Sequence, residues 1–361
     1  MNGETKWLGD LIVPTPGLQP LWQRALRWFG VLFLAAWKAL RLPRGVLPRP
    51  IRAIVEHWTW STFRVVLGSF VSRAYIDQPC AFVAPDPVSP LGDVEPKHRL
   101  GQDELEAFYR DGWLPPFDVF SRDEIRALGD LLLERRQQPS ATYGFVTDRD
   151  LHLEVPELLA AMRRPEIVDR AAQLLGPDLL CWRSQIFHKP PGAAEIQWHQ
   201  ASSYMLEDYL EPALVPPDRG PLFQLTAWVA VDAATPDNGC LQFISGTHDR
   251  IRTLRFGGDR RFYDVHFDLE FDRSLRSVLV PVKPGQVLLF TERMIHGSGA
   301  NTIDRPRLAF NFRIVPDTVR VYPDKSHHRA MHMGQDYDLK RWGVVTLRGE
   351  DRHKLSRRAP G

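Results

Sequence analysis

The chain has 361 residues, of which 43% are hydrophobic and 25% are charged, as is ordinary for a globular protein. Its formal net charge of +2 is too small to indicate nucleic acid as a partner. Its three cysteines, Cys80, Cys181 and Cys240, form no CxxC pair, which argues against a disulfide framework. The opening residues also lack the basic-then-apolar order of a secretory signal, so we expect a cytoplasmic protein.

Residues 1–95 are predicted to form a helical N-terminal extension. Two basic and aromatic segments, 21–41 and 51–71, are typical of helices, and the Pro-rich sequence LPRGVLPRP separates them. The apolar run 28–37 is much shorter than the roughly 20 residues that a membrane-spanning helix needs, so we expect no span. The first helix then has two interpretations. It packs on the main domain, which is the commoner case, or it lies as a basic amphipathic helix on a membrane surface.

Residues 96–316 are predicted to form the main domain, which opens with helices over 101–114 and over 121–136, the second capped by Ser121. From about Leu179 the pattern changes to short β-branched or aromatic runs separated by turn sequences. These predicted strands are 179–189, 223–233, 240–245, 277–282, 286–290 and 307–315. Many short strands without intervening helices indicate an antiparallel sandwich or barrel. Residues 317–361 are predicted to be a polar, basic C-terminal tail that is disordered at its end.

Two histidines stand beside strand-like runs, His199 in QWHQA and His296 in FTERMIHGSG. A barrel would place such residues at its mouth. Ferrous iron in oxygenases is held by two histidines and one carboxylate on one face, and the opposite positions stay open. With 12 histidines in the chain, a pair by itself is a weak signal. His248 lies in a turn and is expected to be structural.

The surroundings of these histidines carry more information. The relevant motifs are the helix EAFYRDGWLPPFDVFSRDEI, Lys189-Pro190-Pro191, His199-Gln200 with Tyr204 beyond, Asp237-Asn238-Gly239-Cys240-Leu241, Ser245-Gly246-Thr247-His248, PGQVLLF at 284–290, His296-Gly297-Ser298-Gly299, and Arg307. In this order, over about Leu100 to Pro316, the chain resembles the phytanoyl-CoA dioxygenase family of iron/2-oxoglutarate enzymes. The resemblance implies a mostly β fold with added helices, a double-stranded β-helix of the cupin-like jelly-roll type.

The resemblance also implies roles for individual residues. His199 and His296 would bind Fe(II). Arg307 would pair with the distal carboxylate of 2-oxoglutarate, for which a guanidinium fork is well shaped. Ser298 would add a hydrogen bond to the same carboxylate. Trp228 would wall the cosubstrate, although it is equally well interpreted as a core tryptophan.

The chain departs from the family at Ala201, where the motif His-x-Asp has its carboxylate ligand. Three explanations are open. The chain resembles iron/2-oxoglutarate halogenases, in which Ala or Gly replaces the acid and a halide such as chloride takes the vacated place. Alternatively, Glu195 or Glu207 reaches the iron, or the protein is a non-catalytic member that binds a ligand.

We therefore expect an Fe(II)- and 2-oxoglutarate-dependent halogenase (a chlorinase) of an unactivated aliphatic carbon in a natural-product intermediate. A hydroxylase with an unusual third ligand is the first alternative, and a binding protein on a degenerate oxygenase fold is the second. The expected partners are molecular oxygen and a small-molecule substrate, either free or tethered to a carrier protein. The Pro-rich segment 209–220 is a candidate cover for the mouth of the site.

Overall fold

The computed structural model describes most of the chain. The described residues are 21–48, 51, 55, 60, 63, 67, 94–200, 206–207, 211–217, 221–249, 255–257, 266–268, 277–322, 326–330 and 335–360. Ala201 and Tyr204 lie outside them, and so does most of the segment 209–220.

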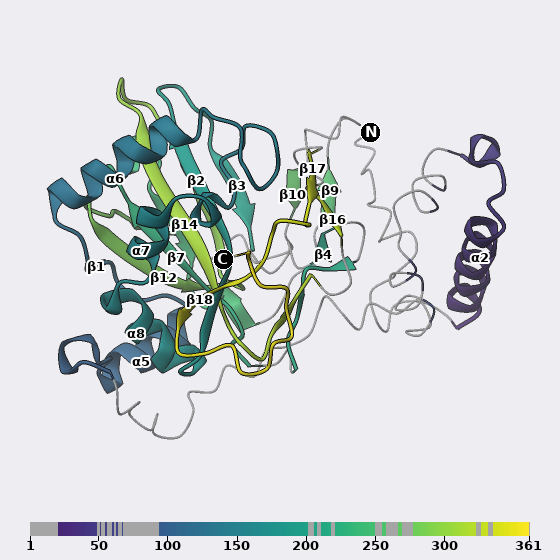
Figure 1. The fold of residues 1–361 in the computed structure, drawn as a ribbon, viewed down its shortest axis with the longest axis horizontal. Coiled ribbons are helices and arrows are strands. Elements are labelled where there is room, and N and C mark those ends of the chain that lie inside the picture. Colours follow the sequence, from purple (N-terminus) through teal and green to yellow (C-terminus); the bar gives the residue numbers. More distant parts are fainter. Residues whose placement is uncertain are drawn as a thin grey trace.

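Helix α2 (Leu21–Ala39) is the first described element (Figure 1). Its side chains reach the second predicted helical segment, because Trp28 Nε1 donates to Leu67 O at 2.8 Å and Lys38 Nζ donates to Val55 O at 2.7 Å. The described residues of that segment are all helical, as predicted. In the described part of the chain, no helix is long and apolar enough to cross a membrane.

The other described helices are η1 (Arg44–Val46), η2 (Pro96–His98), α5 (Gln102–Asp111), α6 (Arg122–Arg135), η3 (Leu151–Leu153), α7 (Pro156–Met162), α8 (Pro165–Leu175), η5 (Pro236–Asn238) and η6 (Thr247–Asp249). The start of α6 confirms the predicted cap. Ser121 Oγ accepts from Glu124 N at 3.2 Å, and the Glu124 carboxylate accepts from Ser121 N at 2.7 Å. This reciprocal capping box satisfies two backbone donors at the helix start.

Helix α5 ends where it meets the strands. Gly112 has a φ of +85°, and a Cβ there would lie 2.4 Å from Met294 Cε and 2.8 Å from His248 Nδ1, so only glycine fits. His248 Nε2 donates to Tyr109 O at 2.8 Å and thereby holds the last turn of α5. His248 thus has the structural role expected for it.

Two antiparallel sheets form the body of the main domain. The larger has the order β1 (Phe117–Asp118), β12 (Gln286–Thr291), β7 (Leu225–Ala230), β14 (Arg307–Pro316), β2 (Leu179–Lys189) and β18 (Val345–Arg348). The smaller has the order β11 (Val278–Val280), β8 (Leu241–Ile244), β13 (Ile295–Ser298) and β3 (Ile196–His199). The described residues also form four two-stranded pairs: β4 (Leu206–Glu207) with β5 (Glu211–Pro212), β6 (Leu214–Val215) with β15 (Arg320–Val321), β9 (Arg255–Gly257) with β10 (His266–Asp268), and β16 (His327–Ala330) with β17 (Gln335–Asp338).

Side-chain alternation gives the larger sheet two different faces. Along β14, Leu308, Phe310 and Phe312 pack in the core shared with α5, α6, α7 and α8, which lie along one side of the sheet (Figure 1). The opposite face of the sheet contributes Trp228 and Phe290 to a second core, which they share with Phe243 and other residues of the smaller sheet. The two sheets thus enclose the space in which the site lies.

The expectation of a disordered C-terminal end is wrong for residues 353–360. Strand β18 pairs with β2 in the larger sheet, and Val344 forms a β-bridge with Arg358. Buried Trp342 anchors this segment in a core, so its apolar residues leave water although the stretch as a whole is basic. Its charges find partners, because Arg358 Nε lies 2.9 Å from Asp351 Oδ2.

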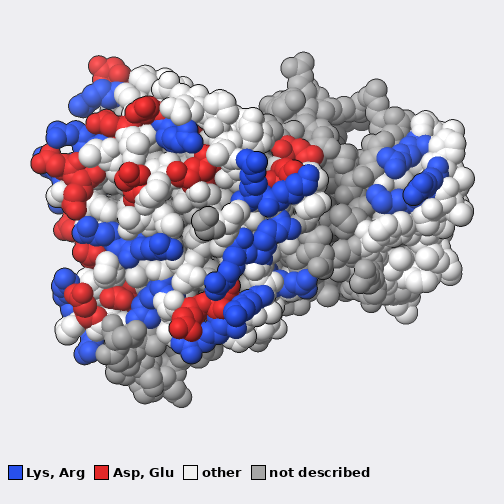
Figure 2. Space-filling model, in the orientation of Figure 1, with Lys and Arg blue, Asp and Glu red and all other residues white. Residues whose placement is uncertain are grey.

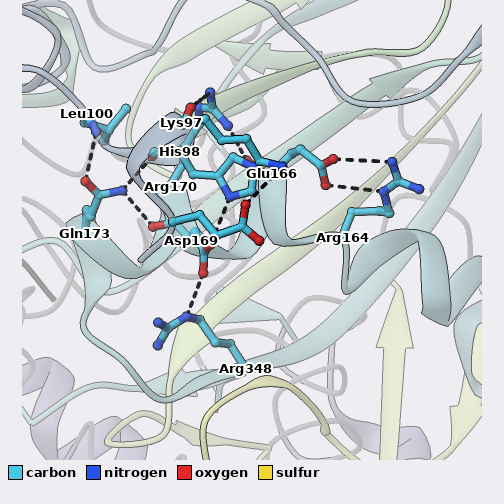
Figure 3. Close-up of polar contacts among 10 residues, drawn as sticks. Lys97, His98, Leu100, Arg164, Glu166, Asp169, Arg170, Gln173 and Arg348 are labelled. Carbon is cyan, nitrogen blue, oxygen red and sulfur yellow. Dashed lines mark hydrogen bonds and ion pairs between the residues drawn. The ribbon is translucent and has the colours of Figure 1, made fainter. Parts of the chain in front are cut away.

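A buried carboxylate joins the two ends of the main domain (Figure 3). Asp169 on α8 accepts from His98 Nδ1 at 3.0 Å and from Arg348 Nε on β18 at 3.1 Å. One helical turn further on, Gln173 Nε2 donates to His98 O at 2.9 Å, and Gln173 Oε1 accepts from Leu100 N at 2.8 Å. The entry to the domain and its last strand are thus tied to one helix.

Candidate functional site

His199 and His296 lie side by side on the smaller sheet, where they face the cavity between the two sheets. Strands β3 and β13 are neighbours, and His199 and His296 are paired positions in their register. The ring centroids are 4.1 Å apart and the rings are inclined at 51°. Both side chains line a cavity of about 250 Å³ between the sheets. Two imidazoles so placed can share one cation.

The hydrogen bonding of His296 favours metal binding. Its Nδ1 lies 2.9 Å from Met294 O, and because a carbonyl only accepts, Nδ1 carries the proton and Nε2 keeps its lone pair. Burial, with the neighbouring His199 as the next cause, holds the pKa of His296 well below its usual value. A neutral imidazole whose second nitrogen is fixed by a carbonyl is the form that binds metal ions.

No third acidic, histidine or cysteine ligand joins the pair among the described residues. Ala201 lies outside that part of the chain, two residues beyond His199. Gln200 between them is buried, and its Nε2 donates to Arg293 O, which fixes the end of β3. Of the two alternative ligands, Glu195 is exposed, whereas the side chain of Glu207 lies outside the description.

Arg307 opens β14 and lies across the cavity on the larger sheet. It is 2% exposed, its Cζ is 5.4 Å from the Trp228 ring centroid, and its Nε has no hydrogen-bond partner among the described residues. Burial lowers the pKa of Arg307 to about 10, although Cys240 and Asp232 offset part of this effect. A buried guanidinium with an unsatisfied donor fits a carboxylate ligand.

Ser298 and Lys189 complete this end of the site. Lys189 Nζ donates to Ser298 Oγ at 3.0 Å and also to Gly299 O. Since the ammonium only donates, Ser298 Oγ accepts, and its own hydrogen is left for another acceptor such as a carboxylate. Lys189 is buried, and burial, reinforced by Arg307, lowers its pKa to about 8. Gly239 makes room, because a Cβ there would lie 2.3 Å from Gly299 O and 2.9 Å from Lys189 Nζ.

Lys189 lies in one of the family motifs, yet no role was predicted for it from the sequence. Arg183 and Arg313 were not predicted as site residues either, although they are paired positions of β2 and β14 and line the same cavity. Strand alternation is the signal that could have found Arg313, because Arg307 and Arg313 are six residues apart and so share a face. No Asp or Glu is among the cavity-lining residues that the structure describes.

Comparisons with known proteins find one matching family. The sequence model of the phytanoyl-CoA dioxygenase (PhyH) family matches residues 108–309. A probable phytanoyl-CoA dioxygenase of Caenorhabditis elegans is 27% identical over 46% of this chain and 53% of its own length. A methylphosphonate hydroxylase of Gimesia maris is 30% identical over 43% of this chain and 52% of its own. The chain thus spans about half the length of these curated relatives.

Among solved structures, CytC3 with Fe(II) and alpha-ketoglutarate (2-oxoglutarate) superposes with a TM-score of 0.59 at 28% identity. The match covers 73% of this chain and 93% of that one. It confirms the predicted fold, a mostly β, cupin-like jelly roll with added helices.

Proposed function

Because this chain belongs to the phytanoyl-CoA dioxygenase family, we propose that it is an Fe(II)- and 2-oxoglutarate-dependent halogenase of an unactivated aliphatic carbon in a natural-product intermediate. The observation that carries the halogenase assignment is Ala201, which stands where the family's carboxylate ligand is expected. When bound, Fe(II) together with 2-oxoglutarate and dioxygen supplies the oxidant that removes a hydrogen atom from the substrate. The contribution of the protein is to hold these reactants in place.

His199 and His296 are the proposed metal ligands. Their rings are 4.1 Å apart between centroids, and the Nε2 lone pair of His296 remains available. Burial favours the neutral form of His296, so no proton competes with a metal ion there near neutral pH.

Arg307 and Ser298 are the proposed anchors of the distal carboxylate of 2-oxoglutarate. Arg307 offers its buried Nε–H as a donor. Ser298 Oγ accepts from Lys189, so its own hydroxyl hydrogen can be donated to the carboxylate. The ring of Trp228 lies against Arg307 and forms a wall of the cavity. A charge-assisted hydrogen bond between buried groups such as these contributes roughly 1.5–3 kcal/mol.

A halide is the proposed third ligand in place of a protein carboxylate. The methyl group of Ala201 cannot bind a metal, and it is smaller than a carboxylate side chain. The walls also favour an anion, because Arg183 and Arg313 line the cavity and no described lining residue is acidic. Chloride is small enough to occupy the vacated place, and bromide should substitute for it.

The proposed substrate is a small molecule, either free or tethered to a carrier protein. Phe187, Ile196 and Leu241 give the cavity apolar walls that suit an aliphatic group. A hydroxylase is the second candidate, and the name of the Gimesia maris relative favours it. The hydroxylase hypothesis requires that an acid such as Glu207 reaches the metal. A cytoplasmic location remains a prediction from the cysteine pattern.

Chloride dependence tests the halogenase proposal without knowledge of the substrate. Full-length protein is loaded anaerobically with Fe(II), and 2-oxoglutarate is titrated in chloride or in a non-coordinating salt at equal ionic strength. We expect tighter 2-oxoglutarate binding in chloride, together with a shift of the iron–cosubstrate absorption band. Ala201→Asp should remove both effects, whereas Ala194→Asp, which places the same charge at an exposed position nearby, should keep them.

The possible outcomes separate the three candidates. A chloride effect that depends on Ala201 supports the halogenase. Turnover of 2-oxoglutarate to succinate with no influence of chloride would transfer the assignment to the hydroxylase. Absence of both iron binding and turnover would favour the non-catalytic binding protein.

A further inference from the structure

Helix α2 presents one wholly apolar face to solvent. Trp22 is 65% exposed, Phe29 62% and Phe33 57%. These residues and Leu26 follow one another at intervals of four, three and four positions, so they form one stripe along the helix. Leu21, Leu32 and Leu40 are also exposed and extend it. Soluble proteins rarely leave so continuous an apolar surface uncovered.

The other side of α2 is already occupied. Val31, Leu34 and Ala35 are buried, and the hydrogen bonds of Trp28 and Lys38 reach the segment that contains Val55 and Leu67. This side of α2 thus packs against the second helical segment of the N-terminal extension, whereas the packing interpretation placed the helix on the main domain. The exposed stripe needs a different explanation.

The distribution of charge around α2 indicates what binds to its apolar stripe. The chain from position 11 to position 55 has no Asp or Glu. Its basic residues are Arg24, Arg27, Lys38, Arg41, Arg44, Arg49 and Arg52. Figure 2 shows blue side chains beside a broad white surface over α2 and no red there. A second copy of this helix would bring like charges together with no acid to pair them, whereas anionic lipid headgroups would pair with the exposed Arg41 and Arg44.

We propose that α2 binds the surface of a membrane that contains anionic lipids, with its apolar stripe immersed at the boundary between headgroups and acyl chains. A helix of 19 residues is about 28 Å long and would lie in the plane of the interface. Trp22 and the two phenylalanines are side chains that such an interface accommodates well. This proposal does not depend on the chemistry of the metal site.

Vesicle flotation of the full-length protein tests the proposal. Vesicles of phosphatidylcholine alone are compared with vesicles that also contain phosphatidylglycerol, at low and at high salt. We expect at least about tenfold more binding to the anionic vesicles, with release at high salt. The triple variant Trp22→Ser, Phe29→Ser, Phe33→Ser should lose at least about tenfold in affinity, since each ring adds buried apolar area.

Val146→Ser with Leu355→Ser is the matched control, because these side chains are exposed hydrophobic groups of the main domain. It should bind the vesicles like the wild type. If the triple variant does not fold, as judged by circular dichroism, Arg41→Glu with Arg44→Glu replaces it and should also weaken binding to anionic vesicles about tenfold.

Several results would overturn the proposal. One is a wild-type protein that floats with neither kind of vesicle. Another is binding that neither variant weakens. A third is a dimer, seen by light scattering, that the triple variant converts to a monomer without any vesicle binding, which would make a second copy of the chain the occupant.

Discussion

Replacing Arg307 with leucine should raise the stability of the protein without 2-oxoglutarate and at the same time weaken its binding of 2-oxoglutarate. Burial lowers the pKa of this guanidinium from its usual value to about 10, which corresponds to a cost of about 3 kcal/mol for holding the charge inside the protein. The unfolded chain retains the proton up to a higher pH than the folded chain does. The cost is therefore fully present at neutral pH and is relieved only as the pH rises above about 10.

Without 2-oxoglutarate, Arg307→Leu removes this cost but leaves a small void, since leucine is smaller than arginine. We expect the variant to unfold at a temperature about 2–6 °C above that of the wild type, because 1 kcal/mol corresponds to roughly 2–4 °C in a domain of this size. With 2-oxoglutarate at about 100 times its Kd, the wild type should gain about 2.7 kcal/mol and the variant almost nothing. The order of the two melting temperatures should then reverse.

Differential scanning fluorimetry of the Fe(II)-loaded protein, with calorimetric titration of 2-oxoglutarate, measures both effects. Arg305→Leu is the control, because Arg305 is exposed two residues earlier and should change neither quantity. An unchanged Kd of Arg307→Leu for 2-oxoglutarate would refute the role of Arg307 as an anchor of this cosubstrate. A variant that is much less stable than the wild type without 2-oxoglutarate would equally contradict the view of Arg307 as a buried, under-satisfied cation.

Three further predictions concern the same site. His199→Ala and His296→Ala should each abolish stoichiometric Fe(II) binding in metal analysis, and full iron content in both would contradict the metal assignment. Lys189→Met should weaken 2-oxoglutarate binding about three- to tenfold. In the wild type the affinity should fall as the pH rises through about 8, where the ammonium loses its proton, and a Kd that is flat across this range would exclude the role. Gly239→Ala should lower the free energy of unfolding by at least about 2 kcal/mol in urea titrations, because the added Cβ meets a backbone oxygen. Gly246→Ala, at a similar φ of +76° but in open space, controls for backbone strain alone, and an equal loss in both would disprove the clash.

Much of the main domain could be predicted because its strands are long and strongly patterned. The predicted strand 179–189 coincides with β2, and 307–315 with all but the last residue of β14. These two strands form the longest antiparallel pair of the larger sheet, so their local pattern and their tertiary partners agree. His199 and His296 were placed by motif, and the register of β3 and β13 brings them together as expected.

The features that were not predicted share one physical cause, which is that the local sequence does not show which residues come together in the folded protein. The composition of the C-terminal segment is typical of a basic tail. Its residues Trp342 and Val344 are nevertheless buried, and they pack this segment against the main domain. Arg183 and Lys189 lie within a predicted strand, but only the packing of the two sheets shows that their side of β2 faces the site. The pattern of residues 21–41 predicted a helix, and α2 covers Leu21–Ala39, but the pattern could not show which face of the helix remains exposed.

The register of β14 explains how one strand serves the core and the site together. Leu308, Phe310 and Phe312 pack beneath the helices, while Arg307 and Arg313 line the cavity from the opposite face. A slip of one residue would turn the arginines into the helix-covered core and the apolar residues into the cavity, so the pairing with β2 and β7 must be exact. The register with β2 shifts only after Arg313, in a β-bulge that lies beyond the last cavity-lining residue of the strand. The alternation of side chains therefore stays intact from Arg307, the proposed anchor of 2-oxoglutarate, to Arg313, whose charge helps to lower the pKa of His296. The proposed metal site on the smaller sheet can for this reason be matched to Arg307 and Arg313 on the larger sheet, both of which lie on a strand and not on a loop.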